Sequence, residues 1–168
     1  AVQNLLLTDQ CLENFDSAYH LIPPLRGEEA RVGLLEAVAA GSVQGLCSDH
    51  QPQDAASKDA PFSATEPGMI GLQTLLPLCL KLVEQGTIDL LSMVSLLTQG
   101  PAQVLGIEQG QLSVGADADI CIFDPQQSWL FDPSSSRSRG HNSPYMNQML
   151  KGRVSHTLLA GSLVYRVD

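Results

Sequence analysis

The chain has 168 residues, of which 43% are hydrophobic and 16% charged, with a formal net charge of −9 at pH 7. This composition is that of a folded globular chain and excludes intrinsic disorder. The negative charge argues against nucleic acid and anionic membranes as partners, because both attract basic surfaces. The most apolar stretch, 69–83, is interrupted by Gln73, Thr74, Pro77 and Lys81. We therefore interpret it as a core helix and not as a membrane span.

The N-terminus and the cysteines bear on where the protein works. No basic segment followed by an apolar one opens the chain, so nothing indicates a secretory signal. The chain starts at Ala1 without methionine, and we expect an N-terminal part of the same protein to precede it. The four cysteines form no Cys-x-x-Cys pair: Cys11, Cys47, Cys79 and Cys121. We expect reduced, buried thiols in preference to disulfides, a cytoplasmic location, and no cysteine zinc site.

Apolar periodicity and turn residues divide the chain into helices, strands and loops. The expected elements, in order, are a brief helix from Thr8 or Asp9 to Phe15, a loop over 17–26, a helix over 28–40, a strand over 43–48, a long loop over 50–68, helices over 71–84 and 88–98, a helical turn over 101–105, strands over 111–114 and 118–124, a flexible loop over 134–140, and a hairpin over 154–167 that turns at Gly161. Pro77 either kinks its helix or marks where that helix properly begins.

These elements supply too few parallel strands for a self-sufficient sheet. Parallel strands are normally buried on both faces and need neighbours. We therefore interpret residues 1–106 as the last strands and helices of an α/β barrel, and residues 107–168 as strands of an appended β-domain. The remaining barrel strands must come from a preceding segment or from another chain.

The most informative motif is Ser48-Asp49-His50-Gln51-Pro52-Gln53, which follows the expected strand over 43–48. An aspartate at the carboxyl end of such a strand occupies the position where α/β barrels keep their catalytic groups. The motif resembles the Asp-His-x-Pro-His signature of dihydroorotases, with Gln53 in place of the closing histidine.

Further fragments in the same order strengthen this resemblance over nearly the whole chain. They are Leu5-Leu6-Leu7-Thr8, Pro23-Pro24-Leu25-Arg26, Pro61-Phe62, Gly71 to Leu78, Gly100-Pro101-Ala102, Gly115 to Asp119, and Phe123-Asp124-Pro125. The chain resembles the C-terminal portion of the dihydroorotase branch of the amidohydrolase superfamily. The resemblance implies the α/β class: part of a zinc-bearing (β/α)8 barrel of the TIM type, plus strands of a small composite β-domain.

The resemblance also assigns roles at the expected site. Asp49 stands where the family has a metal-binding general base, beside a zinc ion that lowers the pKa of bound water. Gln53 stands at the position of a substrate-contacting histidine, and Ile22 at that of an asparagine that binds the pyrimidine ring. Phe62 and Ser63 match a place where the family offers backbone groups to substrate, although they could equally be plain loop.

Three substitutions point away from catalysis. Gln3-Asn4 precedes the Leu-Leu-Leu run where the family carries a histidine metal ligand, and neither amide is a plausible zinc ligand. Ile22 offers no polar atom, and Gln53 cannot carry a proton. Asp49 would bind metal only if metal is retained, and we expect no zinc here.

The remaining polar residues have ordinary interpretations. The four histidines, His20, His50, His141 and His156, form no metal-binding spacing and are interpreted as loop, surface or core residues. Arg26 could grip a carboxylate, or could pair with Glu28 or Glu29 as a structural ion pair.

Three hypotheses follow. The preferred one is a catalytically degenerate dihydroorotase homologue, similar to the inactive relatives that serve as structural subunits of aspartate transcarbamoylase in bacterial pyrimidine biosynthesis. Its partners would be aspartate transcarbamoylase or further copies of itself. The alternative is an active zinc-dependent dihydroorotase or related cyclic amidohydrolase. The third is a folding module without activity of its own.

Overall fold

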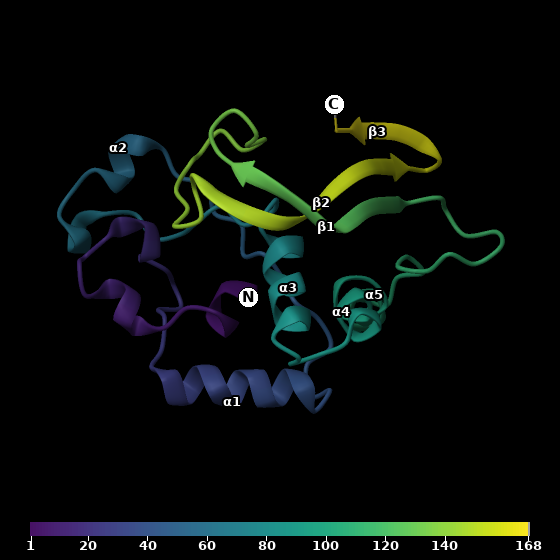
Figure 1. Cartoon of the computed structure of the whole chain (residues 1–168), viewed down its shortest axis with the longest axis horizontal. Coiled ribbons are helices and arrows are strands. Elements are labelled where there is room, and N and C mark those ends of the chain that lie inside the picture. The colour runs from purple at the N-terminus through teal and green to yellow at the C-terminus, as the bar shows by residue number, and fades with distance from the viewer. Residues whose placement is uncertain (168) are drawn as a thin grey trace.

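A computed structural model describes residues 1–167. The elements within these residues are η1 (Val2–Leu5), η2 (Asp9–Leu12), η3 (Ser17–Tyr19), α1 (Glu28–Ala39), α2 (Ala55–Lys58), η4 (Phe62–Ala64), α3 (Leu75–Glu84), α4 (Leu90–Leu97), α5 (Gln99–Leu105), β1 (Ile120–Phe131), β2 (Gln148–Leu159) and β3 (Ser162–Arg166), where η denotes a 3-10 helix. Helices and loops fill the first two thirds of the chain, and the sheet lies across them (Figure 1).

The sheet is antiparallel with the order β1-β2-β3. β1 and β2 pair from Ile120 opposite Leu158 to Phe131 opposite Gln148, with two shifts of register. The predicted hairpin with a turn at Gly161 is confirmed, because β2 and β3 meet there and Gly161 has a φ of +78°. The prediction of a strand over 111–114 was wrong, because this segment belongs to a long connection of turns and loop between α5 and β1 (Figure 1).

The main core lies between α3 and the sheet, and Figure 1 shows α3 beneath the β1–β2 hairpin. The buried side chains include Leu78, Cys79 and Leu82 from α3, and Trp129, Phe131 and Leu150 from the strands. Gly152 permits the close approach of β2. Its φ is +95°, and a Cβ there would lie 2.1 Å from Cδ1 of Leu80. The predicted core helix is thus confirmed.

Helix boundaries follow local chemistry. α1 begins at Glu28, as predicted from the acidic first turn. α3 begins at Leu75 and not at residue 71, so Pro77 lies in its first turn, where its missing N–H breaks no helical bond. The carboxylate of Asp89 accepts a hydrogen bond of 2.8 Å from the Ser92 amide and caps α4.

No strand is formed over 43–48 within residues 1–167, although the sequence predicted one there. This segment borders helices instead: the Leu46 amide donates to the Leu96 carbonyl at 3.0 Å, and the Val2 amide donates to the Cys47 carbonyl at 3.0 Å. One parallel bridge follows, between His50 and Met69. An extended segment forms a ladder only where other strands lie beside it, and within residues 1–167 the neighbours are η1 and the end of α4.

Burial of the cysteines also differs from expectation. All four thiols are free, but only Cys79 is buried, whereas Cys47 and Cys121 are exposed and Cys11 is intermediate. Burial raises the pKa of the Cys79 thiol to about 12, so this thiol remains protonated as a core residue. No helix within residues 1–167 is both long and apolar enough to cross a membrane.

Candidate functional site

Asp49 sits at a sharp turn of the backbone. Its φ is +45°, in the left-handed region that aspartate tolerates better than most residues. Its Oδ1 accepts a hydrogen bond of 2.8 Å from Nε2 of Gln51, two residues further on. The carboxylate is half-buried. One carboxylate oxygen of Asp49, the predicted general base, is therefore hydrogen-bonded to the side-chain amide of Gln51.

His50 is committed to the backbone. Its Nδ1 accepts from the Gly71 amide at 3.0 Å and lies 3.4 Å from the Leu72 amide. An acceptor Nδ1 requires the proton on Nε2, because a neutral imidazole has one donor and one acceptor nitrogen. Burial lowers the pKa of His50. The structural interpretation of this histidine fits these bonds.

Gln53 serves the loop in which it lies. Its side-chain Nε2 donates to the Pro67 carbonyl at 3.0 Å, and its backbone amide donates to Oδ1 of Asn142 at 2.9 Å. The Gln53 side chain therefore links its own loop to the backbone at Pro67.

Asn142 is a residue that the sequence analysis did not single out, and it organises this region. Its Nδ2 donates to the carbonyls of Gln51 and Gly68, both at 2.9 Å, while its Oδ1 accepts from Gln53. All the hydrogen-bonding capacity of its nitrogen is used. Asn142 fastens the Asp49 loop, which we define as residues 48–53, to the segment 67–71. The only sequence signal is its place after the low-complexity stretch that ends at Gly140.

Glycines allow these segments to approach so closely. A Cβ on Gly71 would lie 2.4 Å from the Ser48 carbonyl oxygen, and one on Gly140 would lie 2.8 Å from the Gln53 carbonyl oxygen. Gly68 has a φ of +119° and lies against the Gln51 side chain. The Asp49 loop is thus closely packed by backbone on several sides.

The other predicted substrate positions make different contacts. Ile22 is 63% exposed. The ring of Phe62, on η4, stacks on His20 with centroids 4.7 Å apart and meets Phe15 edge-on. Ser63 is exposed. Ile22 and Phe62 have apolar side chains that cannot hydrogen-bond to Asp49, and within residues 1–167 no hydrogen bond joins Ser63 to it.

His20 contacts the Thr65 hydroxyl through its ring and the Gly68 amide through its carbonyl oxygen. Oγ1 of Thr65 donates to the Phe62 carbonyl at 2.8 Å, so its 2.8 Å contact with Nδ1 of His20 requires the histidine to be the donor. The His20 carbonyl accepts from the Gly68 amide at 2.8 Å. His20 therefore has a structural role, as predicted from its isolation in the sequence.

The residues do not by themselves form a zinc site. No three histidine, cysteine, aspartate or glutamate side chains within residues 1–167 lie close enough to share a metal ion. Gln3 is 2% exposed, and Oδ1 of Asn4 is buried without a hydrogen-bond partner. An amide oxygen is a poor zinc ligand, so this orphan acceptor does not complete a site around Asp49.

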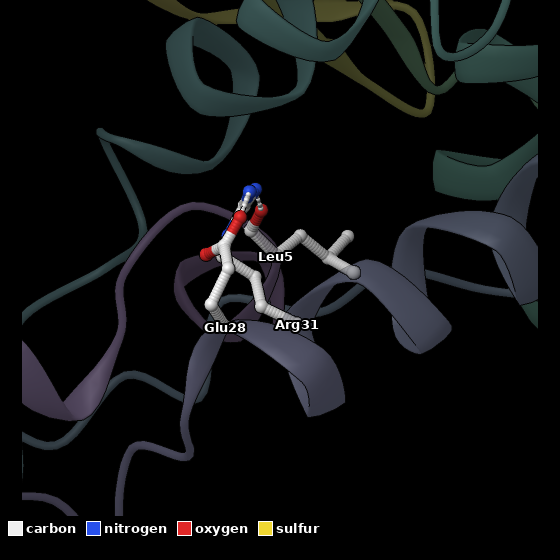
Figure 2. A network of polar contacts seen from close by, with 3 residues as sticks. All are labelled: Leu5, Glu28 and Arg31. Atoms are coloured by element: carbon white, nitrogen blue, oxygen red, sulfur yellow. Dashed lines mark hydrogen bonds and ion pairs between the residues drawn. The ribbon is translucent and has the colours of Figure 1, made fainter.

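Arg31, and not Arg26, forms the local ion pair. The Arg31 guanidinium grips both carboxylate oxygens of Glu28, with Nε–Oε2 at 2.7 Å, and its Nη1 donates to the Leu5 carbonyl at 3.2 Å (Figure 2). Arg31 thereby ties the start of α1 to the end of η1. Arg26 is exposed, and within residues 1–167 it forms no ion pair with Glu28 or Glu29. Of the two alternatives for Arg26, the ion pair with Glu28 or Glu29 is therefore not formed within these residues.

The architecture and the sequence together define the class. The chain is a mixed α/β piece, and residues 22–164 match the amidohydrolase family. The chain belongs to that family. This confirms the predicted fold class, a C-terminal portion of an amidohydrolase barrel.

Curated relatives narrow the family to its dihydroorotase-like members. The chain is 47% identical over 165 residues to a dihydroorotase-like protein of Pseudomonas aeruginosa, covering 98% of this chain and 39% of that protein. It is 36% identical over 160 residues to a dihydroorotase of a Geobacter species, covering 95% of this chain and 38% of the relative. The chain thus spans about two fifths of the length of these relatives.

Solved structures give the same picture. An L-hydantoinase (dihydropyrimidinase) from Arthrobacter aurescens superimposes with a TM-score of 0.89 at 29% identity, covering 99% of this chain and 38% of the other. A dihydropyrimidinase from Brevibacillus agri gives a TM-score of 0.85 at 26% identity, covering 98% and 38%. The fold therefore corresponds to a part of these barrel enzymes.

Proposed function

We propose that this chain is part of a catalytically degenerate dihydroorotase homologue, which acts in the cytoplasm as a structural partner of aspartate transcarbamoylase in pyrimidine biosynthesis. The observation that best supports the loss of catalysis is the way the polar side chains of the Asp49 loop are bonded. Gln53 replaces an ionisable residue, and its side chain is bonded to the Pro67 carbonyl. A glutamine can neither bind zinc well nor move a proton at this position.

The neighbouring substitutions support the same conclusion. Ile22 presents an apolar, largely exposed side chain where ring recognition needs a polar atom. Gln3 and Asn4 offer amides where a histidine is expected from the family. Asp49 remains, but its partner within the loop is the neutral amide of Gln51.

The surface of α4 and α5 supports a role in assembly. Leu91 is 82% exposed, and Val104 and Leu105 are 68% and 70% exposed. Exposed apolar side chains in such numbers are typical of surfaces that other protein covers. The rest of the same protein or a partner subunit would cover them, and the partnership with aspartate transcarbamoylase rests on the family resemblance.

A working zinc-dependent dihydroorotase, or related cyclic amidohydrolase, is the second candidate. The retention of Asp49 favours it, as do relatives named dihydroorotase at 36–38% identity. In that case zinc would be bound mainly by residues outside this chain, with Asp49 as a further ligand and general base.

Assembly and metal content separate the two candidates. The complete natural protein, purified without chelators, should contain far less than one zinc per chain by elemental analysis. It should co-elute in gel filtration with aspartate transcarbamoylase of the same organism, at a fixed ratio measured by light scattering. Leu91→Glu should weaken co-elution if α4 is at the interface. Stoichiometric zinc together with separate elution would contradict the proposal.

A further inference from the structure

A groove outside the Asp49 loop has a composition unlike the rest of the chain. It encloses about 480 Å³ between the start of α3, the loop 134–137 and one face of the sheet. Two arginines and two aromatic residues line it: Arg137, Arg153, Trp129 and Tyr165. No aspartate or glutamate lies among its lining residues within 1–167. In a chain with a net charge of −9, this is a local concentration of positive charge.

Each guanidinium is held over an aromatic ring. Arg153 lies 5.7 Å from the centroid of Trp129, and Arg137 lies 5.6 Å from that of Tyr165. Trp129 is itself fixed, because it is 8% exposed and its Nε1 donates to the Gly152 carbonyl at 3.0 Å. An aromatic ring beneath a guanidinium attracts the cation but uses none of its N–H groups.

These guanidiniums have no acidic partner in the described chain. The ion pairs within residues 1–167 are Glu28–Arg31 and Glu84–Lys151, and no hydrogen bond there uses a side-chain N–H of Arg137 or Arg153. Each guanidinium therefore retains five donors. In a partly enclosed groove, an oxyanion receives paired hydrogen bonds from such a donor set and meets less screening than on open surface.

The loop that carries Arg137 is held in place by Gln73. Nε2 of Gln73 donates to the Ser135 carbonyl at 3.0 Å, and the backbone amide of Arg137 donates to Oε1 of Gln73 at 2.5 Å. One glutamine side chain thus anchors the loop at two points. The sequence predicted a flexible loop over 134–140, but these bonds fasten it to the residues just before α3.

A second, smaller hollow continues the groove. It encloses about 120 Å³, shares Leu72, Gln73 and Arg137 with the first, and is also lined by His50 of the Asp49 loop. Arg137 therefore stands between the groove and the edge of the family motif. A ligand bound through Arg137 would lie beside the Asp49 loop without depending on Asp49.

We propose that this groove binds a small organic dianion, a phosphate ester or a dicarboxylate. The anionic groups take the N–H groups of Arg137 and Arg153, and the carbon skeleton lies against Leu76 and Pro77 on the first turns of α3. Recognition rests on the planar donor fork of arginine, which matches both phosphate and carboxylate geometry.

Calorimetric titration of the complete protein in buffer with physiological salt tests this site. Glycerol 3-phosphate and succinate are the two probes, and they distinguish a phosphate ester from a dicarboxylate. We expect saturable binding of at least one of them. Arg153→Gln and Arg137→Gln should each weaken it by about tenfold or more, because each removes a charge-assisted contact. Arg153→Lys should give an intermediate loss, since it keeps the charge but not the fork.

Arg166→Gln is the matched control, because Arg166 is exposed on β3 and does not line the groove. It should leave the affinity unchanged. Far-ultraviolet circular dichroism of each variant checks the fold, and a variant that fails it is replaced by its Lys counterpart. Absence of binding for both probes would overturn the proposal, as would an equal loss in Arg166→Gln, which would indicate diffuse charge alone.

Discussion

The Asp49 loop and the arginine groove are neighbouring polar regions that use their polar groups in opposite ways. In the loop, the side chains of His50, Gln51 and Gln53 are all bonded to protein, and Asn142 fastens the surrounding backbone. In the groove, the guanidiniums of Arg137 and Arg153 lie over aromatic rings, yet their side-chain N–H groups have no protein partner within residues 1–167.

The contrast shows that a family motif and an available binding surface need not coincide. Polar groups that bond to one another stabilise a loop, but they are no longer free for a ligand. Polar groups that are oriented without being satisfied can still bind one. The polar groups of the motif therefore stabilise the Asp49 loop, whereas those of the groove are available to bind a ligand. Four predictions test this difference between the loop and the groove.

The largest expected effect comes from Asn142→Ala. This change removes three hydrogen bonds, to Gln51, Gly68 and Gln53. At about 1 kcal/mol for each bond, we expect the free energy of unfolding to fall by about 3 kcal/mol. Urea denaturation measures it. Gln126→Ala, on the exposed part of β1, is the control and should stay within about 0.5 kcal/mol. An equal loss of free energy of unfolding in the two variants would show that the Asn142 hydrogen bonds do not stabilise the loop.

Gly152→Ala should destabilise the packing of β2 on α3 by about 2 kcal/mol, because the new Cβ meets Leu80 at a left-handed backbone position. Thermal unfolding measures the loss. Adding Leu80→Ala removes the steric clash. The double variant should therefore lose less free energy of unfolding than the sum of the losses in the two single variants. Strict additivity would show that backbone strain alone accounts for the cost.

Gln53→Ala should cost about 1 kcal/mol in urea denaturation, through loss of the bond to the Pro67 carbonyl. Gln53→His restores the residue type of the family signature. It should not restore dihydroorotate hydrolysis to the complete protein, because Gln3, Asn4 and Ile22 remain. Recovery of turnover in Gln53→His would show that a single exchange separates this loop from an active one.

The smallest effect concerns pH. Burial lowers the pKa of His50 in the folded chain, so the unfolded chain binds the proton more readily. Stability should therefore fall as the pH drops from above the unfolded histidine pKa of about 6.5 toward the lower folded value. His50→Asn keeps an acceptor near Nδ1 and should flatten this dependence. His141→Asn, at an exposed position, is the control, and an unchanged slope in His50→Asn would reject the assignment.

Local chemistry made much of the fold predictable. The acidic first turn of α1 and Gly161 in the hairpin each specify their own neighbourhood, and both elements formed where expected. The helix α3 formed as well, but it begins at Leu75 and not at residue 71, which places Pro77 in its first turn. The segment 43–48 did not form a paired strand, because pairing depends on which segments lie alongside. No local pattern shows that these are η1 and α4.

The candidate site was predictable only in part for the same reason. The motif pointed to Asp49, and the position of Gln53 showed a lost ionisable group. Asn142 lies 89 residues from Gln53, and the sequence holds no sign of their contact. The groove was missed because its two arginines lie on a low-complexity loop and on a strand, and only the fold brings both to one cavity.

We propose that Asp49 is a structural relic of the family's active site. The most direct test is dihydroorotate hydrolysis by the complete protein supplied with zinc, compared with its Asp49→Asn variant and with Asp59→Asn as the control. The account predicts no turnover above the uncatalysed rate in any of the three. Turnover in the natural protein and in Asp59→Asn, abolished in Asp49→Asn, would contradict it.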